Sequence, residues 1–488
     1  MVQRRGMNTY RKFARDVGMM GIVEILMNLK GVVLLPIITK SITVENYGIW
    51  TQFSTTLSLL TPFVLLGLHH ALIRFLPAIK LTEEVRQQFW SIVGFVSLLS
   101  CILLLLFTFF ALPLSEAIQT PPSFVLLLGF VLLFGAVDIL FLNFFRAFQE
   151  IGKFSVFQIF TFVGDITLIG ASVSIGYGAY GAVVSMLAVR MLSSGGMLFL
   201  VLKKIGFSVP KFSLLKEYLS FGLPTIINSI AYWIVQVSDR YLIAAFLGIA
   251  FVGYYAPAYS FGTMLNLFIF PVTLSLAPVI SKLFASQQME EIKTYLSFSL
   301  KYILAVMIPA VFGLSTLSRQ LLRIFSTEEI ASNASFIIPL VAASFLLYGI
   351  HAVVYQVLGL YKKMKLGGLV WLGAAFLNFF LNLIFIPRIG ILGAALTTFL
   401  AYLVALSLIW YTASRYLSFP VDFVFIGKSL LSAFLMTLIL MAFPPEGMLQ
   451  TFGAIFLGAL FYLLSMLFFK AFTKKELTFF LTLWKKER

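Results

Sequence analysis

Fourteen apolar stretches of about 20 residues follow one another along this chain, and they constrain its fold more than any other feature. A helix rises about 1.5 Å per residue, so each stretch can cross the roughly 30 Å hydrocarbon core of a bilayer. Only 11% of the residues are charged, against about 25% in soluble proteins. We therefore predict an all-α polytopic membrane protein. The predicted spans are 17–39, 50–73, 88–112, 123–145, 154–174, 180–202, 218–247, 253–281, 299–318, 333–360, 366–386, 390–412, 425–443 and 449–469.

The distribution of Lys and Arg predicts how these spans are oriented. Of the 35 basic residues, 28 fall before the first span, in or at the edge of every second loop, or after the last span, and only 4 fall in the intervening loops. Basic loops remain on the cytoplasmic side, so both termini are predicted to be cytoplasmic, in a multi-pass protein of the cytoplasmic membrane. Topology and contact with anionic headgroups then explain the net charge of +16, and no nucleic-acid partner is expected.

Recurring glycine motifs predict an internal duplication. RDVGMMG around Gly18 corresponds to LSFGLPT around Gly222 at an offset of 204, and ENYGIWTQFS around Gly48 corresponds to AFVGYYAPAYS around Gly253 at an offset of 205. Two further pairs of motifs are 212 residues apart. Parallel six-span repeats are typical of transporters in which the substrate passes between two lobes. We predict pseudo-symmetric lobes at 1–211 and 212–413, with two additional helices and a basic cytoplasmic tail at 414–488.

Three segments resemble the polysaccharide-transport branch of the multidrug/oligosaccharidyl-lipid/polysaccharide exporter superfamily. They are YGIWTQFSTTLSLL at 47–60, FFRAFQEIGKFSVFQI at 144–159 and SFGLPTIINSIAYWIVQVSDRYLIAAFLGIAFVGYYAPAYSF at 220–261. The resemblance covers nearly the whole chain. It implies a flippase for polyprenyl-diphosphate-linked oligosaccharides in cell-surface polysaccharide biosynthesis, which alternates between inward-open and outward-open V shapes. The expected partners are this lipid-linked oligosaccharide, membrane lipids and other polysaccharide-assembly proteins, and a monomer is expected.

Ionisable residues inside the spans are candidates for function, because a charge at the bilayer centre costs about 2.5–3.5 kcal/mol even on insertion scales. Lys30, Arg74, Arg190 and Arg240 are the candidate substrate-binding residues. Lys30 and Arg190 lie near mid-depth by their distance from the neighbouring basic loops. A cavity lined by such cations suits a diphosphate, whose oxygens accept charge-assisted hydrogen bonds. Arg74 and also Arg146 have an alternative explanation, because side chains so close to the interface can reach water by snorkelling.

Three acids are candidates for ion coupling: Glu24, Asp165 and Asp239. Glu24 and Asp165 lie in the first half, where drug exporters of the resembled superfamily keep a protonatable acid. A buried carboxylate there could carry a proton from one side of the membrane to the other. The alternative is a static ion pair of the acid with Lys30 or Arg190.

Asp239 also belongs to a candidate Na⁺ site. Asn378 and Asn382 are four residues apart, so they share one face of the eleventh span, and Thr397 and Thr398 follow at the start of the twelfth. Asp239, Asn378, Asn382 and Thr398 together supply hard oxygen ligands. The set is similar to a sodium site in the lipid II flippase branch, although Asn382 replaces an acid there. Ordinary hydrogen bonding between helices is the alternative. The expected coupling ion is thus Na⁺ or H⁺.

Asp239 and Arg240 are adjacent within the seventh predicted span. Neighbouring residues of a continuous helix point about 100° apart, so these two are predicted not to pair with each other. Asp239 is then expected to face the eleventh span. Arg240, 24 residues beyond Lys216 and so about 36 Å along a helix, is expected at the outer rim or in the cavity.

The sequence contains no nucleophile elbow, H-E-x-x-H or Walker A motif, so we expect a transporter rather than an enzyme, with no bound cofactor. A cation-coupled multidrug antiporter is the main alternative, but Lys30 and Arg190 disfavour it. A glycan polymerase or ligase would carry a large extracytoplasmic loop, whereas the outer loops here are short. A scaffold for glycosyltransferases remains a further alternative that a duplicated six-span lobe disfavours.

Overall fold

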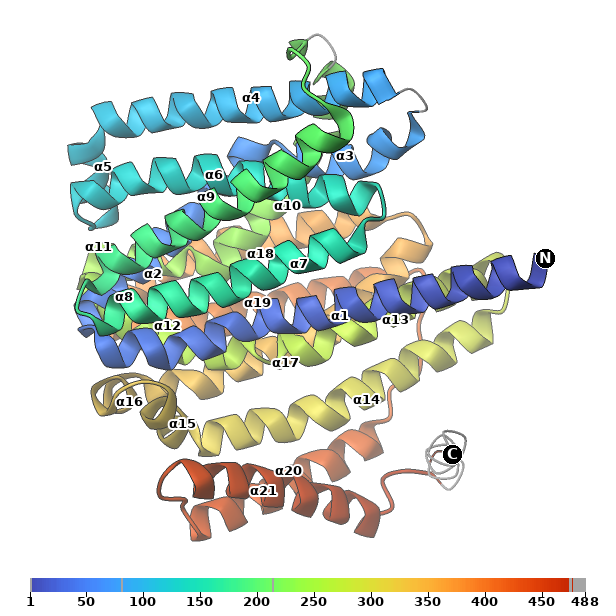
Figure 1. The fold of residues 1–488 in the computed structure, drawn as a ribbon. Helices are drawn as coiled ribbons and strands as arrows, with labels where there is room; N and C mark the ends of the chain where they lie inside the picture. Colours follow the sequence, from blue (N-terminus) through green and yellow to red (C-terminus); the bar gives the residue numbers. More distant parts are fainter. Residues whose placement is uncertain (1, 80–81, 213–214, 474–475, 477–488) are drawn as a thin grey trace. The chain divides into compact units, whose positions relative to one another are not determined.

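The computed structural model describes residues 2–79, 82–212, 215–473 and 476, with the side chains of 2–14, 17 and some positions between 224 and 232 excepted. Every regular element in this part of the chain is helical (Figure 1). The chain divides into two compact units, Met1–Gly253 and Tyr254–Arg488. The predicted lobe boundary at 211/212 and the overall pseudo-symmetry stay predictions.

The first unit contains helices α1 to α11 and the first turn of α12. Their bounds are α1 Val2–Ser41, α2 Val44–Leu65, α3 Leu68–Phe75, η1 Leu76–Ala78, α4 Thr82–Phe109, α5 Ala111–Ile118, α6 Pro122–Ala147, α7 Ile151–Gly164, η2 Asp165–Ile169, α8 Gly170–Ser174, α9 Gly178–Ile205, α10 Leu215–Val237, α11 Asp239–Leu247 and α12 Ile249–Thr263. Helices α4, α6 and α9 lie side by side (Figure 1). Their common core is aromatic, since Phe89 and Phe144 are fully buried with ring centroids 4.7 Å apart.

The second unit contains the rest of α12 and the following helices. Their bounds are α13 Asn266–Ala285, α14 Met289–Thr316, α15 Ser318–Phe325, α16 Glu328–Ala334, η4 Ser335–Ile337, α17 Ile338–Leu360, α18 Met364–Ile389, α19 Ile391–Ser414, α20 Phe423–Ala442 and α21 Met448–Phe468. Helix α17 is central, packing against α13, α14, α18 and α19, while α20 packs against α14 and α21.

The number of membrane-spanning helices is close to the predicted fourteen. In the described residues, 12 helices are long and apolar enough to cross a membrane. Helices α2 and α3 pass the same test together and are bent by 48°, which raises the number to 13. The remaining predicted span, 218–247, corresponds to α10 and α11, parts of which lie outside the described side chains. The predicted all-α membrane fold is confirmed.

Two glycines mark a reciprocal close approach within the first unit. A Cβ atom added to Gly48 would lie 2.1 Å from the carbonyl oxygen of Ile249, and one added to Gly253 would lie 2.1 Å from that of Val44. Both pairs of equivalent positions, Gly48 with Gly253 and Val44 with Ile249, are 205 residues apart. Contacts in which i meets j′ and j meets i′ are those of a two-fold axis. At this crossing, the packing therefore has the symmetry that the repeat predicts.

A buried ion-pair group in the second unit holds the segment that follows α21. Lys301 of α14 is 2.9 Å from Glu476 Oε1 and 3.5 Å from Asp422 Oδ2, and its ammonium lies 4.8 Å from the ring centre of Phe425. Glu476 also accepts hydrogen bonds from the backbone N–H and the hydroxyl of Thr473 at 2.7 and 2.8 Å. The backbone N–H of Glu476 donates in turn to the Thr473 hydroxyl at 3.3 Å, which is the reciprocal pattern of a capping box, and the Glu476 carboxylate neutralises Lys301.

Candidate functional site

The candidate site is built around Asp165, a fully buried carboxylate in the first unit. Asp165 begins η2, a π-helical segment between α7 and α8, and such segments are frequent at functional sites. Gly164 precedes it and allows close packing on α9, because a Cβ there would lie only 3.1 Å from Val189 Cγ2. The backbone thus brings Asp165 next to the turn of α9 that carries Arg190.

Two cations from different helices share one oxygen of this carboxylate. Lys30 Nζ of α1 and Arg190 Nη2 of α9 each donate to Asp165 Oδ2 at 2.9 Å. The Asp165 side chain is 1% exposed, whereas those of Lys30 and Arg190 are 23% and 17% exposed. The carboxylate is therefore sealed inside the protein, while both cations still reach accessible space. This arrangement leaves one positive charge in excess over Asp165.

A second buried acid belongs to the same cluster. Asp138 of α6 is 4% exposed and lies close enough to Arg190 and Asp165 to interact with both electrostatically. Its Oδ1 atom and Asp165 Oδ1 have no hydrogen-bond partner among the described residues. The cluster therefore retains unused acceptor capacity, which can take up a proton or a donor. Asp138 is not among the residues predicted from the sequence, although a carboxylate within the apolar run 123–145 is a signal for a functional role.

The other predicted residues of the first unit do not join this cluster. Glu24 is exposed on α1 and makes no ion pair among the described residues; its backbone carbonyl accepts a hydrogen bond from Asn28. The exposed Arg74 lies with its guanidinium 4.6 Å from the ring centre of Phe221. Stacking of this kind on a neighbouring aromatic ring agrees with an interfacial position. Substrate binding by Arg74 and proton coupling through Glu24 stay predictions.

The expectation that Asp239 and Arg240 cannot pair is wrong. Arg240 Nη1 lies 3.0 Å from Asp239 Oδ1 and also donates to the backbone carbonyl of Gln236 at 3.0 Å. Both residues lie in α11, so the reason is the reach of the Arg240 side chain and not a break in the helix. The long Arg240 side chain folds back over the preceding turn. Both residues are buried, and the pairing offsets the cost of burying their charges.

The predicted amide and hydroxyl residues of the Na⁺ set meet in the second unit. Asn382 Nδ2 donates to Asn378 Oδ1 at 3.1 Å, and Thr397, rather than Thr398, donates to Asn382 Oδ1 at 2.5 Å. Asn378, Asn382, Thr397 and Thr398 are all fully buried. A hard cation needs available oxygen ligands, usually with a carboxylate. Here the amide oxygen of Asn378 accepts from Asn382 and that of Asn382 accepts from Thr397, while Asp239 belongs to the first unit and lies 3.0 Å from Arg240. The Na⁺ site stays a prediction, with inter-helix hydrogen bonding as its alternative.

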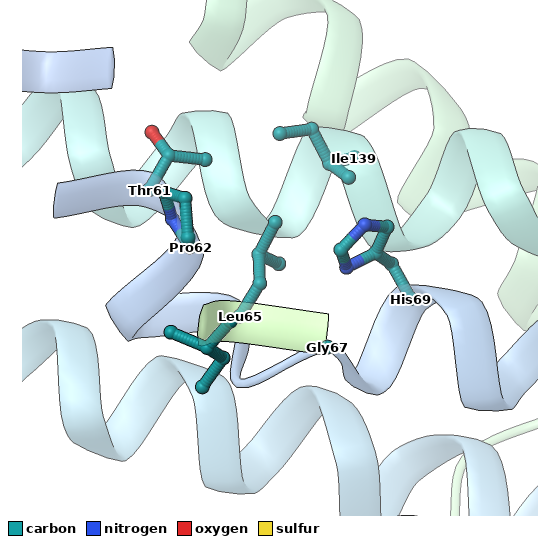
Figure 2. Close-up of a pocket in the computed structure, with 7 residues that line it drawn as sticks. Thr61, Pro62, Leu65, Gly67, His69 and Ile139 are labelled. Atoms are coloured by element: carbon teal, nitrogen blue, oxygen red, sulfur yellow. The ribbon is translucent and has the colours of Figure 1, made fainter. Parts of the chain in front are cut away.

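A cavity of about 200 Å³ lies in the first unit where α2 and α3 meet (Figure 2). The break is a left-handed turn, with φ of 46° at Leu66 and 70° at Gly67. Figure 2 shows Thr61, Pro62 and Leu65 on one side of the turn and His69 on the other, with Ile139 of α6 nearby. The lining is mostly apolar. The cavity lies at the bend between α2 and α3, and among the described residues no group of charged side chains like the Asp165 cluster lines it.

The comparison with protein families identifies the chain. The model for the family described as polysaccharide biosynthesis protein matches residues 13–284. This chain belongs to that family. A second family model, MatE, matches residues 224–384. The predicted relationship to the exporter superfamily is thereby confirmed.

One curated relative and two solved structures extend this result. The probable low-salt glycan biosynthesis flippase Agl15 of Haloferax volcanii is 26% identical over 319 residues, covering 64% of this chain and 66% of that protein, just under two thirds of its length. The lipid II flippase MurJ in an inward closed conformation has a TM-score of 0.73 at 19% identity, over 94% of this chain and 99% of MurJ. An inward-facing MATE multidrug transporter has a TM-score of 0.62 at 16% identity, over 79% and 94% of the two chains. These structures show a shared fold.

Proposed function

We propose that this member of the polysaccharide biosynthesis family is a flippase for a polyprenyl-diphosphate-linked oligosaccharide in cell-surface polysaccharide biosynthesis. The observation that carries the proposal is the convergence of Lys30 and Arg190 on the single buried carboxylate of Asp165. Two cations held within apolar spans suit an anionic substrate headgroup and oppose a cationic drug. The similarity to a glycan biosynthesis flippase supports the same substrate class.

Asp165 acts in this proposal as an internal counterion. Without substrate, it neutralises part of the charge of Lys30 and Arg190 and joins α1, η2 and α9. A diphosphate offers more acceptor oxygens than the one shared Oδ2 atom, so it competes for both cations through their exposed sides. Binding then loosens the link between the three segments. A ligand shifts a conformational equilibrium only if it interacts differently with the two states, and this exchange of partners supplies such a difference.

The remaining parts of the proposal concern setting and coupling. We place the protein in the cytoplasmic membrane with both termini in the cytoplasm, acting as a monomer, without catalysing a reaction and alongside other polysaccharide-assembly proteins. The distribution of basic loops supports this orientation. An ion gradient drives the cycle, and protons would act through Asp165 and Asp138, two of the buried acids of the first unit.

A cation-coupled multidrug antiporter is the second candidate. The MatE match over residues 224–384 and the likeness to a MATE transporter favour it. The two candidates differ in the charge that the cavity must accept: Lys30 and Arg190 would pair with an anionic headgroup, whereas a cationic drug would have to replace them beside Asp165 and Asp138.

The test uses a strain that lacks the protein. A lipid-diphosphate oligosaccharide is expected to accumulate on the cytoplasmic leaflet, and re-expression of the wild type is expected to clear it. Lys30→Ala and Arg190→Ala should lose this clearance, whereas Lys153→Ala, which removes a cation paired with Glu150 outside the cluster, should clear normally. Normal clearance by both cluster variants would contradict the proposal. Absence of accumulation together with altered drug sensitivity would indicate the antiporter.

A further inference from the structure

An open groove of about 590 Å³ lies in the second unit between α14, α17, α19 and the beginning of α20. Its walls are mainly aliphatic and aromatic, and its size is typical of ligand sites. Tyr411 and Phe423, which line it, are 59% and 75% exposed, so the groove opens at the surface of the helices. It contains none of the residues of the Asp165 cluster.

The groove becomes less polar with distance from the end of α19. Ser414 is the last residue of that helix and lines the groove, followed inward by Tyr411, Trp410, Ser407 and Leu406. The eight helical steps from Leu406 to Ser414 span about 12 Å of helix, close to the depth of one leaflet of a roughly 30 Å hydrocarbon core. Trp and Tyr at one end and aliphatic side chains further in are the arrangement found where protein crosses from headgroups to acyl chains.

A positive charge lies at the polar end of the groove. The guanidinium of Arg415 is 4.4 Å from the ring centre of Tyr411 and donates a hydrogen bond to its hydroxyl. Arg415 is exposed, and no acidic side chain in the described part of the chain forms an ion pair with it. Lys301, which neighbours the groove residue Leu300, is by contrast buried and paired with Glu476. Arg415 is therefore an exposed cation at the polar end of this groove.

We propose that the groove binds one acyl chain of an anionic phospholipid, with the headgroup phosphate on Arg415. The apolar walls suit the chain, the serine and aromatic side chains suit the interfacial region, and the exposed guanidinium suits the phosphate. With Arg415 on the cytoplasmic side, as the basic loops predict, the lipid belongs to the leaflet that is rich in anionic headgroups. This inference needs only membrane insertion and is independent of the transported substrate.

Native mass spectrometry of the purified full-length protein tests the proposal, with phosphatidylglycerol or phosphatidylcholine of the same acyl chains added. The wild type is expected to prefer phosphatidylglycerol by roughly fivefold, the effect of one basic residue at an anionic surface. Arg415→Gln should lose the preference and still bind lipid. Ser407→Trp, which fills the groove, should lose one bound lipid of either kind. Arg388→Gln removes an exposed cation of the same unit outside the groove lining and should behave as the wild type.

The controls separate the possible outcomes. Ser414→Trp fills the groove from its polar end and repeats the test if Ser407→Trp does not yield folded protein, as judged by size-exclusion chromatography. An unchanged lipid preference in Arg415→Gln, or unchanged lipid occupancy in the folded tryptophan variant, overturns the proposal. Displacement of phosphatidylglycerol by a small excess of polyprenyl phosphate also overturns it, because the occupant would then be the carrier lipid.

Discussion

Replacing Gly48 or Gly253 with alanine is the sharpest perturbation that the fold offers. A methyl group at either position would lie 2.1 Å from a backbone carbonyl oxygen, belonging to Ile249 or Val44. Contacts of a real Cβ below 3.0 Å essentially never occur, so the two backbone segments must separate by at least about 0.9 Å. A backbone atom cannot rotate away as a side chain can.

The cost follows from this displacement. Forcing an extra methyl group into close-packed structure typically costs about 1–3 kcal/mol. By the predicted topology, Val44 and Ile249 follow outer loops, so the crossing closes the outer end of the first unit. If the transport cycle opens this crossing, the penalty falls only on the closed state. A penalty of about 1–3 kcal/mol shifts the equilibrium about 5–150-fold toward the open state.

Cysteine accessibility measures this shift. Cys101 is the single native cysteine and is replaced with serine first. A cysteine is then introduced at Thr51, which is buried one turn beyond Gly48 on the same face of α2, and is labelled with a membrane-impermeant maleimide. Gly48→Ala and Gly253→Ala are each expected to raise the labelling rate and lower the flipping rate. Gly31→Ala is the matched control, because nothing lies within 4 Å of a Cβ at Gly31.

The reasoning fails if both variants label and transport like the Gly31→Ala control. It also fails if only one of them differs, because the two contacts are reciprocal and close the same crossing. Equal amounts of folded protein, checked by size-exclusion chromatography, separate a shifted equilibrium from misfolding.

Two further predictions concern stability. Gly222→Ala should lower the melting temperature, because its Cβ atom would lie 2.4 Å from the carbonyl oxygen of Leu66. Gly18→Ala is the control, since a Cβ atom at Gly18 meets nothing within 4 Å. Equal melting temperatures of the two variants would refute this prediction. Burial tends to raise the pKa of the Glu476 carboxyl, but hydrogen bonds from a backbone N–H and from Lys301 outweigh it and hold the pKa below its usual value. Its stabilising effect is therefore present at neutral pH and is lost as the pH falls through that lowered pKa. Thermal melts should thus show E476Q less stable than the wild type at pH 7 and equal to it in acid; a pH-independent difference would argue against the ion pair.

The sequence predicted the helical membrane fold well because span length and basic loops are local signals. The i, i+4 spacing of Asn378 and Asn382 likewise predicted their shared face, and the two side chains do form a hydrogen bond. Such inferences need only the regular geometry of one helix. They concern the side of the helix from which a side chain starts, and not how far a long side chain reaches.

The sequence identified the charged residues of the Asp165 cluster, but it did not predict that Lys30 and Arg190 share one carboxylate oxygen of Asp165. Lys30, Asp165 and Arg190 each stood out as a charge in an apolar span, but Lys30 and Asp165 are 135 residues apart. Only packing of α1 and α9 around η2 brings them to one oxygen atom. The error at Asp239 and Arg240 has another origin, because the angle between neighbouring helix positions does not limit how far the long Arg240 side chain folds back toward Gln236 and Asp239.

The contacts between the two halves support the internal duplication better than the sequence matches do. Isolated glycine matches are weak evidence of duplication, since glycine is common in membrane helices. At the crossing, however, the offset of 205 that relates Gly48 to Gly253 also relates the carbonyl groups that they approach. A side chain at either glycine would disturb the same interface, so each half constrains the other. By contrast, Gly222 is tightly packed and its counterpart Gly18 is not. Both pairs share glycine, but only at the crossing do both members of the pair meet a backbone carbonyl group.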